Sequence, residues 1–254
     1  MLQALSDAPL HVEARGLLLC RPESRVLLDP DGSHGEPGVH GFVFASEHGM
    51  AMGFGAPSVR LADELRDLAD RHGMVQEPLE LHLPISCANE WLALDGVTSL
   101  GLHRVQVLDE NAVDGKTIEG GLVGQGVRHS VAHETVVLES KSDPLLETLP
   151  RALRAEFAAM RPWPMVVASL AGECIASIAS AFVETENYFD VSIDTVPDFR
   201  RAGFGFACAR ALIEQQRLRG KEPVWMVREK NRASLALSEQ LGFRDIGRVQ
   251  SLLF

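Results

Sequence analysis

Residues 191–207 read Val191-Ser192-Ile193-Asp194-Thr195-Val196-Pro197-Asp198-Phe199-Arg200-Arg201-Ala202-Gly203-Phe204-Gly205-Phe206-Ala207, a β-branched segment followed by two closely spaced glycines. The strand that its first residues predict must end near Pro197, because proline has no N–H group to donate to a sheet. Gly203 and Gly205 allow the backbone to turn and to approach a ligand closely. We therefore predict a strand, a glycine loop and a helix in direct succession.

The helix after the loop has a regular apolar face. Its apolar residues recur every three or four positions, at Phe204, Ala207, Cys208, Ala211 and Leu212. The first N–H groups of a helix have no partner within the helix, and its dipole favours negative charge at that end. We therefore predict a pyrophosphate site built from the amides of six residues: Arg201, Ala202, Gly203, Phe204, Gly205 and Phe206.

A second unit of strand and helix follows the first. Residues 223–227 predict a strand, and Asn231 begins a helix that ends in Leu241-Gly242-Phe243. Together with Arg200-x-x-Gly203-x-Gly205, this block resembles the GCN5-related N-acetyltransferase (GNAT) superfamily over roughly residues 130–254, in a bacterial branch that carries an additional N-terminal region. The resemblance implies an α/β fold of the α+β type, with a mixed sheet, in the C-terminal half.

The rest of the C-terminal half fits this expectation. We predict a strand at 134–138, a helix that starts at Asp143-Pro144 and continues through Phe157, a hairpin of 165–170 with 174–179, and a strand at 189–196. The resulting order, β-α-β-β-β-α-β-α, is that of the family core.

The polar, glycine-bearing residues 109–121 suggest a domain boundary. We expect an N-terminal α+β domain at 1–115 and the acetyltransferase domain at 126–254. In the first half, residues 89–94 and 99–108 echo the Asn231 block and the tail after it, which suggests a degenerate internal repeat. An unrelated α+β cap is the alternative. Residues 53–58 contain no Arg-x-x-Gly-x-Gly, so this half would lack a phosphate loop.

Composition limits the class of protein and of partner. The chain has 254 residues, of which 46% are hydrophobic, and a net charge of −11 with a pI near 5.3. An acidic chain is a poor partner for nucleic acid but tolerates an amine substrate. We find no signal peptide and no run of eighteen apolar residues, so we expect a cytoplasmic protein without a membrane partner, and leave a homodimer open.

The resemblance also implies where the cosubstrate acetyl-CoA binds. The backbone of Ile193 and Thr195 would lie along the pantetheine arm, with the Ile193 N–H polarising the thioester carbonyl. Arg200 would begin the pyrophosphate loop. Asn231 would bond the cofactor arm, although asparagine also caps helices without any ligand.

Candidates for proton transfer are less clear. Glu186 and Asp190 lie at the start of the strand where the family often has a glutamate base. Ser238 stands where the family often has a tyrosine acid, and serine is a poor acid, so this departure puts the acid in doubt. His129 and His133 are four residues apart, but no third ligand has a usable spacing, and we expect no metal site.

We therefore predict an N-acetyltransferase that moves the acetyl group of acetyl-CoA to a primary amine, on a small molecule, by direct attack in a ternary complex. Two alternatives remain open: a non-catalytic acyl-CoA sensor or partner-binding protein that keeps the fold, and a nucleotide-binding protein that uses the same loop.

Overall fold

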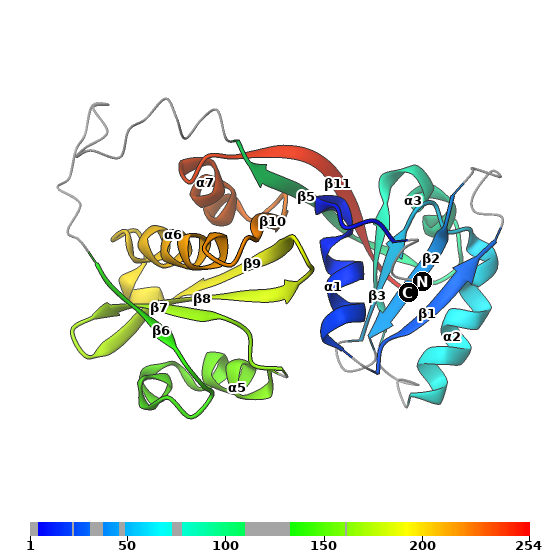
Figure 1. The fold of residues 1–254 in the computed structure, drawn as a ribbon. Coiled ribbons are helices and arrows are strands. Elements are labelled where there is room, and N and C mark those ends of the chain that lie inside the picture. The colour runs from blue at the N-terminus through cyan, green and yellow to red at the C-terminus, as the bar shows by residue number, and fades with distance from the viewer. Residues whose placement is uncertain are drawn as a thin grey trace.

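A computed structural model describes residues 5–21, 23–30, 38–45, 49–72, 78–109, 133–160 and 162–254. The chain forms two lobes, joined by two long strands that run side by side from one lobe to the other (Figure 1). The expected boundary between residues 115 and 126 lies outside the described residues. Within them, no helix is long and apolar enough to cross a membrane.

A single mixed sheet runs through both lobes. The described strands pair in the order β1-β2-β3-β4-β11-β5-β10-β9-β8-β7-β6. The C-terminal half supplies β6 (Glu134–Leu138), α5 (Arg151–Ala159), β7 (Val166–Ala171), β8 (Cys174–Glu184), β9 (Tyr188–Thr195), α6 (Phe204–Arg217), β10 (Glu222–Arg228), α7 (Arg232–Gln240) and β11 (Phe243–Leu253). The predicted α/β class and the order of its core elements are confirmed.

The N-terminal half repeats this order of elements. It contains α1 (Val12–Cys20), β1 (Arg25–Asp29), β2 (His40–Ala45), β3 (Met50–Phe54), α2 (Ala62–Arg71), β4 (Glu80–Pro84), α3 (Ile85–Leu92) and β5 (Thr98–Leu108). After the first helix of each half, three antiparallel strands precede a second helix and then a strand parallel to the third, β4 beside β3 and β10 beside β9. The C-terminal half has one strand more, β6, which comes before α5 and pairs with β7. This shared topology supports a duplication, as the sequence echo suggests.

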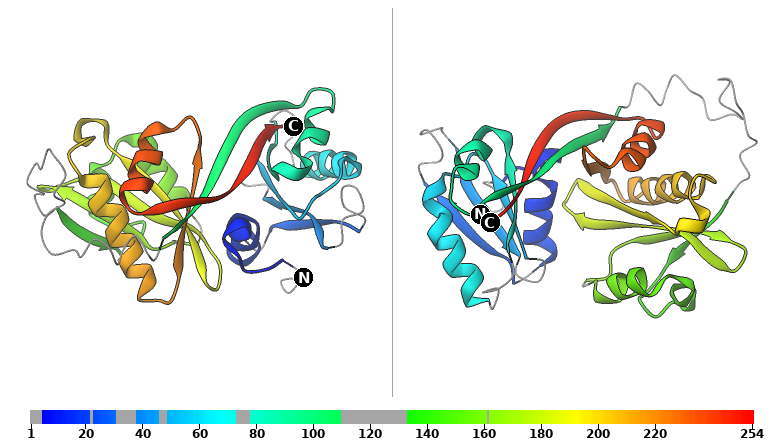
Figure 2. Two further views of the ribbon diagram at one scale, coloured as in Figure 1. Left: turned by 90° about the horizontal axis from the view of Figure 1, so that it is seen from above. Right: turned by 180° about the vertical axis from the view of Figure 1, so that it is seen from behind.

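The last strands of the two halves are exchanged. β5 closes the N-terminal half in sequence but pairs with β10, whereas β11 closes the C-terminal half and pairs with β4. The two exchanged strands also pair with each other along most of their length. Figure 2 shows them crossing together between the lobes. Leu252 of β11 is consequently fully buried in the N-terminal core with Phe42, Leu83 and Trp91.

Helix α1 lies between the lobes and packs on both (Figures 1 and 2). Its Ala14 and Leu17 share an apolar cluster with Met52 of β3 and Val183 of β8. The helix can approach β8 closely because residue 16 is a glycine, whose Cβ would lie 2.9 Å from the Cβ of Val183. On the C-terminal lobe, α6 and α7 cover one face of the sheet and α5 the other.

One predicted helix is wrong in extent. The segment after Asp143 forms a 3-10 helix, Pro144–Thr148, and α5 begins separately at Arg151. Pro150 separates the two, because proline in a helix interior removes a hydrogen bond and clashes with the preceding turn. Helix α1 and strand β1 have no counterpart among the predicted elements.

Candidate functional site

The glycine loop has the predicted conformation. Arg201 and Gly203 have φ angles of 62° and 91°, and Gly203 is the N-cap of the 14-residue helix α6. Alternation of ordinary and left-handed residues turns successive N–H groups toward one concave side. The first amide that bonds within the helix is that of Ala207, which donates to the Gly203 carbonyl at 3.1 Å. The amides of residues 201–206 have no acceptor among the described residues.

Two further contacts hold this loop in place. His133 Nε2 lies 2.8 Å from the Ala202 carbonyl oxygen, and the His133 ring stacks on Phe204 with centroids 4.0 Å apart. Gly205 lies against β9, since a Cβ there would be 3.0 Å from Thr195 Oγ1. The side chains of Arg200 and Arg201 are exposed beside the loop. The loop therefore offers an ordered, positively polarised site for a doubly charged group such as a diphosphate.

Strands β9 and β10 separate next to this loop. Their parallel ladder covers only Tyr188–Asp190 and Glu222–Val224. On the other side of β9, the Val196 N–H donates to the Ala176 carbonyl of β8 at 2.9 Å. Because the backbone groups of an antiparallel strand alternate in direction, the N–H groups of Thr195 and Ile193 point away from β8, into the space where β10 has diverged. Both amides thus face the opening in which the family resemblance would place the pantetheine arm.

Asp190 marks the point where the two strands separate. Its Oδ1 accepts a hydrogen bond from the Met226 N–H at 3.3 Å, at the position where the next ladder bond to β9 would form. The side chain is buried, and burial, followed by the negative charge of Glu13, raises its pKa well above the ordinary value. A buried carboxyl group of raised pKa beside the strand opening is a candidate for proton transfer.

Glu186 and Ser238, the other two candidates for proton transfer, both have partners within the protein. Glu186 forms a two-pronged ion pair with Arg15 of α1 at 2.6 and 2.7 Å, and the hydrogen bond from Arg15 lowers its pKa, which makes it a weaker base. Ser238 is fully buried in α7 and donates to the Leu235 carbonyl at 2.9 Å. Its hydroxyl is therefore neither exposed nor free to protonate a leaving group.

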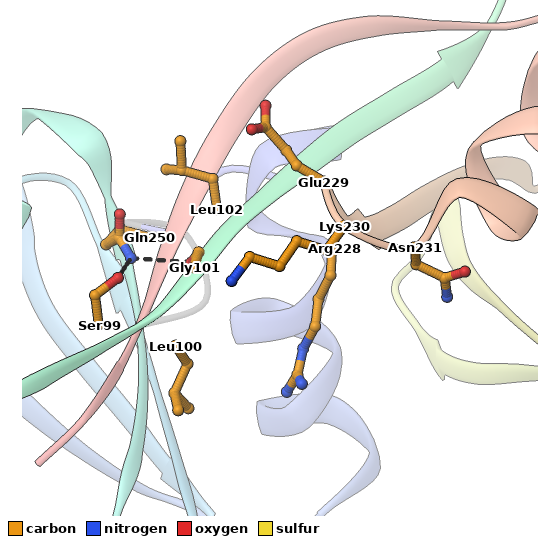
Figure 3. A pocket seen from close by; sticks show the side chains of 9 residues that line it. All are labelled: Ser99, Leu100, Gly101, Leu102, Arg228, Glu229, Lys230, Asn231 and Gln250. Atoms are coloured by element: carbon orange, nitrogen blue, oxygen red, sulfur yellow. Dashed lines mark hydrogen bonds between the residues drawn. The ribbon is translucent and has the colours of Figure 1, made fainter.

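A pocket of about 610 Å³ lies where β5, β11 and the segment after β10 meet (Figure 3). Asn231 lines it, and its Oδ1 caps α7 by accepting from the Ser234 N–H at 3.2 Å. That bond leaves the amide nitrogen of Asn231 available to a ligand. Residues 99–102 of β5 and Gln250 of β11 form the opposite wall. The strand exchange thus makes both halves contribute to one pocket beside the predicted cofactor arm.

A cluster of ionisable groups, here called the interdomain cluster, lies next to this pocket and comprises Glu13, Glu80, His82, His103 and Arg228. His82 is bonded to Glu13 at 3.1 Å and to Glu80 at 3.0 Å. Arg228, which also lines the pocket, donates to His103 Nε2 at 3.1 Å and to Glu80 at 3.3 Å. Five elements, α1, β4, β5, β10 and β11, meet here, because Ser251 of β11 also donates to Glu80 at 2.7 Å.

The two histidines of the interdomain cluster differ in charge. Burial alone would lower the pKa of His82, but its bonds to Glu13 and Glu80 outweigh burial and raise it to about 9. Burial, reinforced by the positive charge of His82, lowers the pKa of His103 to about 4. The pKa of Glu80 falls to about 2, mainly through its hydrogen bond with His82. At neutral pH, His82 is therefore a cation between two carboxylates, and His103 is neutral.

The corresponding loop of the N-terminal half is closed. The Ala56 N–H donates to His40 Nδ1 at 2.7 Å, and the Ser58 N–H donates to Asp29 Oδ2 at 2.7 Å. Two amides that could bind an anion are therefore already bonded, and the Asp29 carboxylate occupies the place where a phosphate would have to bind. The sequence predicts that this half lacks a phosphate loop, and the structure shows its loop amides bonded to side chains instead.

The part of the chain that the structure describes contains no candidate metal site. No group of three or more His, Cys, Asp or Glu side chains there is arranged to hold a metal ion. His133 instead contacts the Ala202 carbonyl of the glycine loop, and His129 lies outside the described residues.

Comparison with known protein families gives one match, and it covers the residues of the candidate site. A family model described as GNAT acetyltransferase matches residues 166–250, which span the loop, the strand opening and Asn231. This segment of the chain is therefore similar to a GNAT acetyltransferase domain. The remaining residues of the chain lie outside that match. No curated protein matches the chain.

Solved structures extend the GNAT likeness to the whole chain, as a likeness of fold. A GCN5-related N-acetyltransferase from Kribbella flavida has a TM-score of 0.63 at 12% identity, with 98% of this chain and 96% of that chain covered. A tandem GNAT protein from the clavulanic acid biosynthesis pathway has a TM-score of 0.61 at 15% identity, with coverage of 100% and 92%. A putative GNAT acetyltransferase from Novosphingobium aromaticivorans has a TM-score of 0.58 at 16% identity, covering 97% and 98%.

Sequence reasoning missed the interdomain cluster and most of the pocket. Their residues come from segments that are far apart in the sequence, such as those of Glu13, Glu80 and Arg228, and the exchange of β5 and β11 brings these segments together. The only local signal was the echo between residues 99–108 and the tail after Asn231, which indicates equivalent strands without indicating their exchange.

Proposed function

We propose that this protein is an N-acetyltransferase that transfers the acetyl group of acetyl-CoA to a primary amine of a small molecule by direct attack in a ternary complex. The main support is the row of amides at residues 201–206 without an acceptor, at the start of α6 and beside the opening between β9 and β10. A loop of this kind suits the diphosphate of CoA, and the opening suits its extended pantetheine arm.

In this proposal the chain's own groups have distinct tasks. The Ile193 N–H donates to the thioester oxygen as negative charge develops on it during attack. The amine nitrogen forms a bond to the carbonyl carbon, the carbon–sulfur bond breaks, and CoA leaves as a thiolate that takes a proton from solvent. Asp190 receives the proton that the amine loses, through a water molecule, because its carboxyl group is buried. The Asn231 side chain positions the pantetheine arm.

The second candidate is a non-catalytic acyl-CoA sensor, and one observation favours it. Ser238 stands at the position of the family's usual acid but is buried and bonded to the Leu235 carbonyl, so the chain has no evident acid for the thiolate. A CoA thiolate can still leave without an enzyme acid, because a thiol with a pKa of about 8.5 is acidic enough for its anion to be a good leaving group. The acetyltransferase hypothesis therefore does not require a general acid at position 238.

Free-thiol release distinguishes the two candidates. The full chain is incubated with acetyl-CoA and a panel of primary amines, and free CoA is measured with a thiol reagent, while calorimetry measures the binding of acetyl-CoA, CoA and ATP. We expect acetyl-CoA binding and amine-dependent release of CoA. Tight CoA binding without release for any amine would favour the sensor. Binding of ATP without binding of CoA would reject both candidates.

A further inference from the structure

The pocket between the two halves carries a positive charge that no described residue neutralises. Three charged residues line it in sequence, Arg228, Glu229 and Lys230. The Lys230 side chain is exposed and has no hydrogen bond or ion pair with any described residue. In Figure 3 the Lys230 side chain extends across the pocket toward β5. This charge stands out in a chain whose net charge is −11.

The negative charge among the lining residues is already compensated. Glu229 accepts from Arg248 at 2.9 Å and lies 3.4 Å from Arg104, and Figure 3 shows its carboxylate directed away from Lys230. The hydrogen bond from Arg248 lowers the pKa of Glu229, so it stays ionised within this network. Glu229 is therefore unavailable to a positively charged ligand in the pocket.

Arg228 is also partly compensated, through the interdomain cluster. Its guanidinium contacts Glu80 at 3.3 Å, but Glu80 is shared with the protonated His82 at 3.0 Å. The Arg228 side chain remains 57% exposed. Two cations thus line the pocket: the Lys230 side chain has no ion pair with a described residue, and Arg228 shares the Glu80 carboxylate with His82.

The remaining walls suit a small, partly apolar molecule. Leu100 and Leu102 supply apolar surface, and the Gln250 amide nitrogen is bonded to Ser99 Oγ and to the Gly101 carbonyl, each at 2.9 Å. A volume of about 610 Å³ lies within the range of small-molecule sites. The pocket lies on the same strand as the proposed base, because Arg228 is two residues after Met226 on β10, and the Met226 N–H is bonded to Asp190 where β9 and β10 separate.

From these observations we infer that the interdomain pocket binds the acceptor, and that the acceptor is an amine that also carries a carboxylate, held by Lys230 with Arg228. This inference rests on the proposed acetyltransferase function and adds the class of substrate. The carboxylate would supply the negative charge that the pocket lacks, and the amine would point toward the opening between β9 and β10. A polyamine would instead meet two cations, and like charges repel.

Matched acceptors test the inference. We would measure kcat/KM for CoA release with amino acids of increasing chain length and with the primary amide of each, which keeps the amine and removes the negative charge. The acid should be preferred over its amide by about tenfold to a hundredfold, the range of a charge-assisted hydrogen bond. In Lys230→Met this preference should fall about tenfold through KM, whereas the Kd for acetyl-CoA should not change.

The control is Lys141→Met, which removes an exposed lysine remote from the pocket, in the segment after β6, and should leave the preference unchanged. Equal use of acids and amides, a preference for diamines, or a preference that survives Lys230→Met would overturn the inference and leave the proposed function standing. A loss of acetyl-CoA affinity in Lys230→Met would show that the lysine serves the cofactor, which also overturns it. Absence of CoA release and of acetyl-CoA binding would refute the proposed function itself, and the inference with it.

Discussion

The exchange of β5 and β11 predicts that a substitution near the C-terminus will destabilise the N-terminal lobe. Leu252 is fully buried in the N-terminal core, although it belongs to the last strand of the chain. Leu252→Ala removes three carbons from a packed site, and such changes cost about 2 to 5 kcal/mol of unfolding free energy. For a protein of this size we expect Tm to fall by about 4 to 20 °C, at about 2 to 4 °C per kcal/mol.

Hydrogen exchange followed by mass spectrometry shows which strands the substitution destabilises. In Leu252→Ala, peptides that contain β2 and β4 should exchange faster, because their core has lost a side chain. Leu212→Ala is the matched control, since Leu212 of α6 is fully buried in the C-terminal core with Phe189. It should accelerate exchange in β8 and β9. If Leu252→Ala accelerated exchange in β8 and β9 and left β2 and β4 unchanged, β11 would belong to its own half and the exchange would be refuted.

Three further outcomes follow from the site. Calorimetry should give one acetyl-CoA per chain, because Asp29 and His40 occupy the equivalent loop of the N-terminal half, and two equal sites would contradict this. Folding raises the pKa of His82 from 6.5 to about 9, so the unfolding free energy should fall by up to about 3 kcal/mol as the pH rises from 6.5 through 9. That fall should be absent in His82→Gln, and an identical pH profile would reject the ion pairs. Asp190→Asn keeps an acceptor for the Met226 N–H but cannot take a proton, so kcat should drop by about 10² to 10⁴ with normal acetyl-CoA affinity. An unchanged kcat would place the base elsewhere.

The parts of the fold that the sequence predicts are those with a local physical cause. Gly203 takes a left-handed conformation, and Gly205 allows close approach to Thr195, so the loop follows from residue type and spacing. The amide directions of Ile193 and Thr195 follow from the alternation of a strand whose partner diverges. The shared topology of the two halves has an echo in the sequence, because both halves need the same pattern of strands and helices.

The features that escaped prediction depend on contacts between distant segments. Glu186 lies near the expected base position in sequence, but Arg15, 171 residues away, fixes it in an ion pair. The alternation of apolar residues in β11 predicts a strand but does not identify its neighbour. From the sequence, β11 could pair with a strand of either half. The charge state of His82 depends on Glu13 and Glu80 from two other places in the sequence, and no spacing rule connects them.

The central claim is that the amides of residues 201–206 bind the diphosphate of CoA, and the most direct test is the Kd of acetyl-CoA for Gly203→Val by calorimetry. Valine is strained at the φ of 91° that Gly203 adopts, so the amide row should be disrupted. Gly172→Val is the matched control, because Gly172 has a φ of 64° in the turn between β7 and β8, with nothing within 4 Å of its Cβ position. We predict at least a tenfold weaker Kd for Gly203→Val and an unchanged Kd for Gly172→Val, with both variants folded. An unchanged Kd in folded Gly203→Val would contradict the account.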